Sequence, residues 1–217
     1  GDIAFNGIVG GTVPLNSLTI DSAKNVTAAN AIIAGSLTQK SGTGTTSLHA
    51  VTTNTAAGIN LTAAEIDFLG GKDSIAGSGN IRLQPASPEQ AIAIGGAAKK
   101  PGTLNLTSTN IAALREGFSS ITIGRDDGTG AIAVNSIQFK DPVTIQAPIA
   151  SGPLDIYGLP VNGSIDVNGT LTGVRKASIT LNAARTNLKA DITTQGQPIN
   201  IGKNVWLYND ETKLVTN

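Results

Sequence analysis

Two adjacent aspartates, Asp126 and Asp127, lie among glycines in the stretch SSITIGRDDGTG at residues 119–130. Carboxylates beside flexible glycines can donate oxygen ligands to calcium, as turns of some repeat proteins do. The chain nevertheless contains neither a G-G-x-G-x-D repeat nor a D-x-D-x-D-G loop. Asp-Gly is also the commonest tight-turn pair. The stretch therefore predicts a turn in which Arg125 pairs with an aspartate or a neighbouring strand, and a calcium ion at Asp126 and Asp127 is a second hypothesis.

Paired carboxylates could also cleave a glycosidic bond, and three pairs are candidates: Asp126 with Asp127, Glu65 with Asp67, and Asp210 with Glu211. Residues 65 and 67 would point to the same side of a strand. Sugar clefts usually carry aromatic platforms, however, and the chain has one Trp, two Tyr and four Phe in 217 residues. His49, the sole histidine, is expected to face outward from a strand, and no Ser-His-Asp arrangement can be inferred around it. We therefore expect no enzyme.

Composition excludes several classes of function. The net charge is +0, with 15 basic and 15 acidic residues dispersed along the chain, so no nucleic-acid partner is indicated. No run of 18 apolar residues could span a bilayer. The chain has no cysteine, which excludes disulfides, thiol catalysis and the usual zinc frameworks. Two loops are expected at GGKDS (70–74) and GGAAKKPG (95–102), with Lys99 and Lys100 as solvated lysines on a protruding corner.

Short units that alternate apolar and polar residues recur along the whole chain, which is typical of strands with one buried face. Glycine, Asn, Pro or Asp occupies the gaps between them. The units are SLTI (17–20), SLTQ (36–39), INLT (59–62), IRLQ (81–84), IAIG (92–95), LNLT (104–107), ITIG (121–124), VTIQ (143–146), LDIY (154–157), SIDV (164–167), SITL (178–181), INIG (199–202) and VWLY (205–208).

Weakly similar units of this size are most stable when they stack into a solenoid. We therefore predict an all-β fold, a parallel β-helix that forms a single domain over residues 1–217. Small aliphatic residues suit its narrow interior. A β-sandwich is the alternative, but sandwich cores usually contain more aromatic residues than this chain has. The one helix-like window is IAALREGF (111–118), where Ile111, Leu114 and Phe118 could share a face.

The repeats resemble those of large secreted bacterial adhesins of the filamentous-haemagglutinin type. The resemblance covers nearly the whole chain and is carried by degenerate Gly/Asn/Thr repeats, among them GDIAFNGIVGGTVPLNSLTIDSAKNVTAANAIIAGSLTQ, ITIGRDDGTGAIAVNSIQFKDPVTIQAP and GSIDVNGTLTG. It implies a right-handed parallel β-helix, export to the cell surface and a fibre-like scaffold. It implies no catalytic residue.

We expect a structural or adhesive protein at the bacterial cell surface or in an extracellular fibre, active in cell adhesion and biofilms. The absence of Met indicates a piece of a longer repeat protein or one unit of a fibre. Partners would be a second copy stacked end to end, a continuation of the chain, or glycans and proteins of host or neighbouring cells. No cofactor is expected other than the possible calcium. The alternative is a carbohydrate-binding or carbohydrate-cleaving β-helix, with Tyr157, Trp206 or Tyr208 lining a groove.

Overall fold

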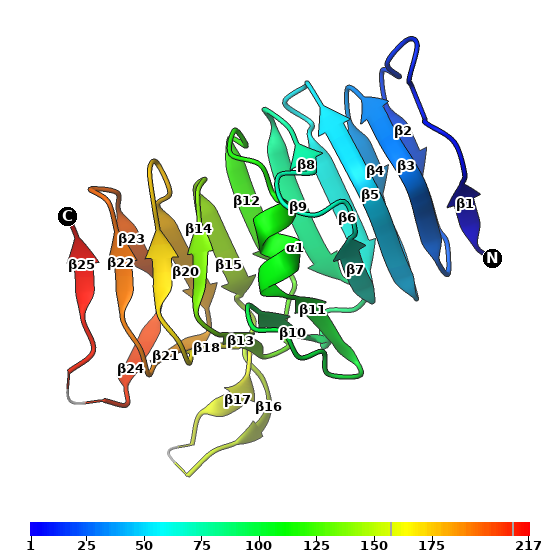
Figure 1. The fold of residues 1–217 in the computed structure, drawn as a ribbon. Coiled ribbons are helices and arrows are strands. Elements are labelled where there is room, and N and C mark those ends of the chain that lie inside the picture. Colours follow the sequence, from blue (N-terminus) through cyan, green and yellow to red (C-terminus); the bar gives the residue numbers. More distant parts are fainter. Residues whose placement is uncertain (157, 210) are drawn as a thin grey trace.

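The chain folds into long parallel β-sheets, as a computed structural model of residues 1–156, 158–209 and 211–217 shows. It is all-β, with 51% of its residues in strands and 3% in helix, which confirms the predicted class. The N- and C-termini lie at opposite ends of the stack of strands (Figure 1). Among the described residues, no helix has the length and apolar character needed to cross a membrane.

The longest sheet has eight parallel strands and runs the length of the molecule, behind the other sheets in the view of Figure 1. It includes most of the strands that the alternating pattern predicted. Its strands are, in order, β2 (Leu18–Ile20), β4 (Leu37–Gln39), β6 (Ile59–Ala63), β9 (Asn80–Pro85), β12 (Ser120–Gly124), β15 (Val143–Ala147), β20 (Ile179–Ala183) and β23 (Ile199–Ile201).

Two further parallel sheets lie in front of it, one toward each terminus, and a single short helix, α1 (Ser108–Ala113), lies between them (Figure 1). The five-stranded sheet consists of β1 (Ile3–Phe5), β3 (Val26–Ala34), β5 (Thr45–Thr53), β7 (Glu65–Phe68) and β8 (Ile75–Ala76). The four-stranded sheet consists of β14 (Ile137–Phe139), β19 (Leu171–Gly173), β22 (Ile192–Thr194) and β25 (Leu214–Thr216).

A six-stranded parallel sheet completes the C-terminal half, and a β-hairpin projects below it (Figure 1). The sheet contains β11 (Thr103–Leu106), β10 (Ala91–Ile94), β13 (Ile132–Val134), β18 (Ser164–Val167), β21 (Arg185–Leu188) and β24 (Asn204–Leu207). The hairpin consists of β16 (Ser151–Leu154) and β17 (Pro160–Asn162), which pair in an antiparallel way, unlike the other strand pairs of the described residues. Because sandwich sheets are antiparallel, the β-sandwich alternative is not supported.

The core consists of aliphatic side chains stacked in register. Leu83 lies opposite Leu61 on one side and Ile123 on the other, and the row continues through Ile145 and Leu181. Each of these side chains is at most 1% exposed. Since alternate residues of a strand point to the same face, most of the apolar-polar-apolar units add one step to such rows. VWLY at residues 205–208 does not, because Val205 and Leu207 of β24 are 42% and 66% exposed. The repeat therefore encodes the core directly.

Two further predictions about local structure need correction. LDIY at residues 154–157 has no buried face, because Leu154 and Ile156 project on the hairpin and are 64% and 91% exposed; Tyr157 lies outside the described residues. The helix covers Ser108–Ala113 and not the predicted residues 111–118. Thr107 caps its N-terminus, and the backbone becomes extended at Leu114, which forms a β-bridge to Ile75. A chain that pairs with a strand in this way cannot continue as a helix.

Candidate functional site

The predicted turn at Asp126 and Asp127 is present directly after β12. Gly124, the last residue of β12, has a φ of 101°, and a side chain there would meet the Gln146 carbonyl oxygen. The Gly128 amide closes the turn on the Arg125 carbonyl oxygen at 3.1 Å. A main-chain hydrogen bond thus closes the turn.

All four carboxylate oxygens of the two aspartates have partners. Arg125 binds Asp127 through two hydrogen bonds, of 2.7 and 2.9 Å. Asp126 accepts hydrogen bonds from Arg82 of the neighbouring strand at 2.8 Å and from Gln146 at 2.7 Å. The bond from Arg82, and then that from Gln146, hold the pKa of Asp126 below its usual value, and the bond from Arg125 does the same for the pKa of Asp127. Both carboxylates are thus ionised and already bound by protein groups.

A calcium ion at this turn stays a prediction. Calcium takes six to eight oxygen ligands, whereas no group of three or more His, Asp or Glu side chains that could hold a metal occurs in the described parts of the chain. An ion at Asp126 and Asp127 would have to displace Arg82 or Arg125.

Glu65 and Asp67 do share one side of β7, as predicted, but a lysine lies between them. The Lys99 ammonium group is 3.1 Å from Glu65 Oε1 and also binds Asp67 Oδ1. Burial lowers the pKa of Lys99, but its hydrogen bonds to Asp67 and Glu65, together with the negative charges of these two groups, outweigh this and raise the pKa overall. The expectation that Lys99 is merely solvated was wrong.

Side chains from the next strand and from α1 complete this cluster. The main-chain and side-chain amides of Asn105 both donate to Glu65 Oε2, at 3.1 and 3.0 Å. Asn110 donates to the Ile66 carbonyl oxygen at 2.7 Å. These contacts join β7 to β11 and α1 where no ladder of main-chain hydrogen bonds links the two strands. The carboxylates therefore hold sheets together, which is a structural use of the pair.

Two chemical candidates remain, His49 and the pair Asp210 and Glu211. His49 is exposed on β5, in agreement with the outward orientation predicted for it. The pair Asp210 and Glu211 cannot be assessed, because Asp210 lies outside the described residues.

Two of the three predicted aromatic residues lie near polar groups at the C-terminal end of the six-stranded sheet. Trp206 is in register with Asn187, whose side-chain amide donates to Asp166 at 3.1 Å. The Lys189 ammonium group binds Asp166 at 2.8 Å and lies 5.4 Å from the centre of the Tyr208 ring. These five residues are the aromatic patch. It contains one carboxylate, Asp166.

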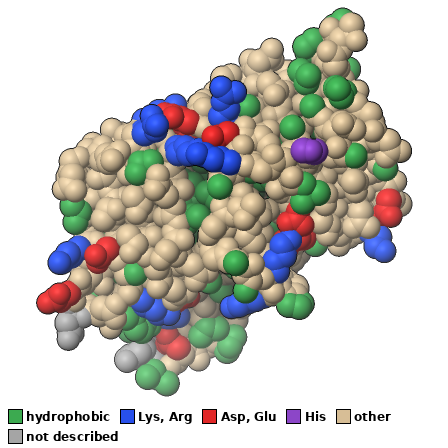
Figure 2. Space-filling view, viewed as in Figure 1, with side chains coloured by type: hydrophobic (Ala, Val, Ile, Leu, Met, Phe, Trp, Pro, Cys, Tyr) green, Lys and Arg blue, Asp and Glu red, His purple; other side chains and the backbone are tan. Residues whose placement is uncertain are grey.

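Sequence reasoning missed the hollow between α1 and β14, which we call the α1 hollow. It has a volume of about 230 Å³ and a mainly apolar lining. Figure 2 shows it near the centre of this face, below a group of Lys, Arg and acidic side chains. Its apolar lining comes from Ile111, Ala112, Leu114, Ile121, Ile137 and Phe139.

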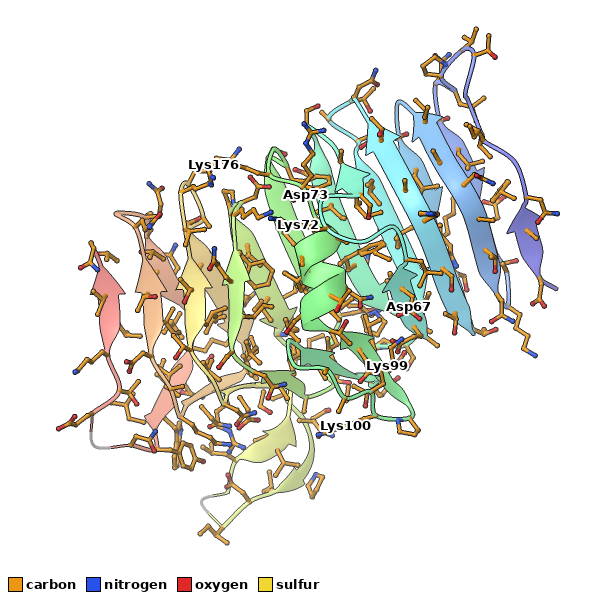
Figure 3. All side chains as sticks on the ribbon, in the orientation of Figure 1. Asp67, Lys72, Asp73, Lys99, Lys100 and Lys176 are labelled. Carbon is orange, nitrogen blue, oxygen red and sulfur yellow. The ribbon has the colours of Figure 1, made fainter. Side chains whose placement is uncertain are left out.

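Charged side chains border the α1 hollow, and a second, polar hollow of about 390 Å³ shares Lys72 and Lys140 with it. Figure 3 shows Lys72 and Asp73 above one end of α1. Three ion pairs occur here, at 2.7, 3.2 and 3.3 Å: Lys140 with Asp73, Arg175 with Glu116, and Lys176 with Asp141.

Asp141 has a further role, since its side chain is only 2% exposed. It accepts hydrogen bonds from the main-chain amides of Gly117 and Phe118, at 3.0 and 3.1 Å. The carboxylate thereby fixes the segment that leads from α1 into β12. No spacing in the sequence could indicate this, because the groups involved come from separate turns of the chain.

Comparison with known protein families, with curated proteins and with solved structures finds no match to this chain in any of the three. The assignment of a function therefore rests on the residues and geometry described above.

Proposed function

We propose that the chain is a segment of a right-handed parallel β-helix whose role is structural or adhesive, in a fibre at the bacterial cell surface or outside the cell. The observation that carries this proposal is the regular order in which the chain visits its sheets. From β13 onward it passes through the six-, four- and eight-stranded sheets three times in succession. A chain that coils in this way pairs each strand with its equivalent one turn later.

The handedness follows from the general preference of parallel strand connections for right-handed crossovers. The rigidity of such a coil comes from main-chain pairing and stacked aliphatic rows, so it needs no disulfides. Its resemblance to filamentous-haemagglutinin-type repeats supports export and an adhesive role. Glycans or proteins of host or neighbouring cells would be the partners of its surface.

The last strands offer an edge through which copies could stack. On either side of β25, the Lys213 carbonyl oxygen accepts a hydrogen bond from the Ile192 amide at 3.0 Å, and the Asn217 amide donates to the Thr194 carbonyl oxygen at 3.1 Å. Because main-chain groups of a strand alternate in direction, Leu214 and Thr216 direct theirs to the open side. An open edge favours pairing with another strand. We propose that a second copy, or further residues of a longer chain, pairs here.

Electron microscopy and sedimentation of the purified chain test this proposal. We expect thin fibres or end-to-end oligomers in the wild type. Thr216→Pro removes one outward-facing amide and should shorten or abolish them, whereas Thr216→Ala keeps that amide and should leave them unchanged. Monomers at all concentrations in the wild type would rule out self-association. Equal loss in both variants would show that the threonine side chain, and not the strand edge, is responsible.

A carbohydrate-binding role is the second candidate, favoured by the aromatic patch. Tyr208 is 53% exposed, and aromatic rings beside amide and carboxylate groups can stack on a sugar while those groups bind its hydroxyls. Glycoside hydrolysis uses two carboxylates, and Asp166 is the one within the patch, so binding without cleavage is the form that we propose.

A glycan panel tests the carbohydrate-binding role. It should show ligands for the wild type that Tyr208→Ala loses. The matched control is His49→Ala, which also removes an exposed ring, but from the five-stranded sheet and away from the aromatic patch. This control should keep the ligands. The absence of any ligand in the wild type, or equal losses in the two variants, would rule out binding at the aromatic patch.

A further inference from the structure

We propose that the α1 hollow binds a small amphipathic carboxylate, with an apolar body about the size of one aromatic ring and an acid group held at Lys72. This site goes beyond the structural role and does not depend on fibre formation. Three independent features support it: a gap in strand pairing, an apolar lining of matching size, and a lysine, Lys72, that forms no ion pair with any described residue.

The gap arises because α1 replaces a strand. The segment after the helix joins the five-stranded side, since Leu114 bridges to Ile75 and the Arg115 amide donates to the Ile75 carbonyl oxygen at 2.8 Å. On the far side of the hollow, β14 pairs with β19 and with no other strand of the described chain. The hollow therefore occupies a position that a strand fills elsewhere in the stack.

The open edge of β14 presents main-chain groups to the hollow. The Ile137 amide donates to Thr170 and the Phe139 carbonyl oxygen accepts from Val174, so both residues bond toward β19. Because the direction alternates along a strand, the amide and carbonyl groups of Gln138 face α1. Gln138 also lines the hollow. Its amide offers a carboxylate a hydrogen-bond donor.

The volume of the α1 hollow limits the ligand to a small molecule. Its volume is about 230 Å³, somewhat larger than the roughly 150 Å³ of an apolar cavity that accepts benzene. Ile111, Leu114 and Phe139 supply apolar surface at its base. Apolar pockets with a few convergent polar groups are the usual form of small-molecule sites. One ring with a short chain fits these dimensions.

The charged side chains around the α1 hollow favour an anionic ligand. Asp73, Glu116 and Asp141 are each bound to a cation of their own, as described above. Lys72 and Arg115 lower the pKa of Asp73 through their charge, but neither forms an ion pair with any residue in the described ranges. Both line the polar hollow that adjoins the α1 hollow. Of the two, Lys72 also lines the α1 hollow itself. An acid group at its mouth would meet this ammonium group, and Asp141 would repel it little because its charge is already compensated.

Titration with 3-phenylpropionate, and with the uncharged 3-phenylpropanol, tests the site by NMR or calorimetry. We expect the acid to bind more tightly than the alcohol, by about tenfold, since a hydrogen bond to a charged group is the stronger kind. Lys72→Met should remove this advantage. Ala112→Phe should fill the hollow from the exposed face of α1 and abolish binding of both compounds.

Lys100→Met is the matched control, because Lys100 is an exposed lysine that lines a different hollow. It should leave both affinities unchanged, and native spectra of all three variants establish that they fold. No binding of the acid at millimolar concentration, equal binding of acid and alcohol, or an equal effect of Lys100→Met would each overturn the proposal. So would an extended peptide that binds along Gln138 where 3-phenylpropionate does not, because the hollow would then be a strand-pairing site.

Discussion

The eight-stranded sheet and the face in front of it are built by different means. In the sheet, each strand repeats the pattern of the one before it, and most of the buried residues are Ile, Leu, Val and Ala in register. On the front face the repetition stops at α1, where the groups that join the segments are polar: Asn105, Asn110 and Asp141, all buried. The repeated strands thus provide stability. The region around α1, where the repetition stops, provides a unique arrangement of side chains in which a specific site can arise.

The largest effect is expected from breaking a stacked row. Leu83→Ala removes the contacts with Leu61 and Ile123 and leaves a cavity in a row that cannot collapse around it, because the strands on both sides are held by main-chain pairing. The free energy of unfolding should fall by about 2–5 kcal/mol. Urea unfolding followed by circular dichroism measures it.

Thr122→Ala is the control for this substitution, since Thr122 alternates with the buried residues of the neighbouring strand β12 and points outward. Its effect should stay below about 1 kcal/mol, the range of strand propensity. Similar losses in both variants would mean that the aliphatic rows do not carry the stability of the sheet.

The next largest effect is expected near α1, where the repetition stops. Asp141→Ala leaves the main-chain amides of Gly117 and Phe118 without their acceptor, and buried unsatisfied donors cost about 1–3 kcal/mol. The same unfolding measurement should show a loss in this range, and hydrogen exchange should become faster at these two amides.

Asp21→Ala is the matched control, because the Asp21 side chain is 80% exposed in its ion pair with Lys40. Exposed pairs contribute at most about 1 kcal/mol. If Asp141→Ala were no more destabilising than Asp21→Ala, the buried carboxylate would have no structural role.

The same contrast explains what the sequence could predict. Alternation in ITIG or VTIQ fixes which residues face inward, and stacking of similar units then determines the strands and the core. The pattern cannot distinguish LDIY, whose Leu154 and Ile156 project from a hairpin, because alternation records period and not burial. Ion pairs between distant segments near α1, such as Lys99 with Glu65, depend on which turns of the coil become neighbours. A local sequence pattern does not show which turns these are.

A smaller effect concerns acid stability at the turn after β12. The folded-state pKa of Asp126 lies below its unfolded value of about 3.9. Its contribution is therefore fully present above that unfolded value and is lost as the pH falls through the folded pKa. Because the side chain is 72% exposed, solvent screens the ion pair, and the contribution should be below about 1 kcal/mol.

Unfolding at pH 6 and at pH 2.5 in wild type and Asp126→Asn measures this contribution. The variant should be slightly less stable than the wild type at pH 6, the difference should be smaller at pH 2.5, and added salt should narrow the difference at pH 6. A variant that is more stable than the wild type at pH 6 would show that Asp126 is repelled by Asp127 more than it is held by Arg82.

The smallest effect is expected from calcium. On the regular part of the stack the carboxylates of Asp126 and Asp127 have guanidinium and amide partners, and these occupy the positions that calcium would need. Excess calcium or a chelator should therefore leave the melting temperature unchanged. If calcium instead raised it in the wild type and not in an Asp126→Asn/Asp127→Asn variant, the ion would have to displace Arg82 or Arg125, and the turn would be a metal site despite its complete set of protein partners. The repetitive eight-stranded sheet would then also carry a specific binding site, and such sites would not be confined to the region around α1 where the repetition stops.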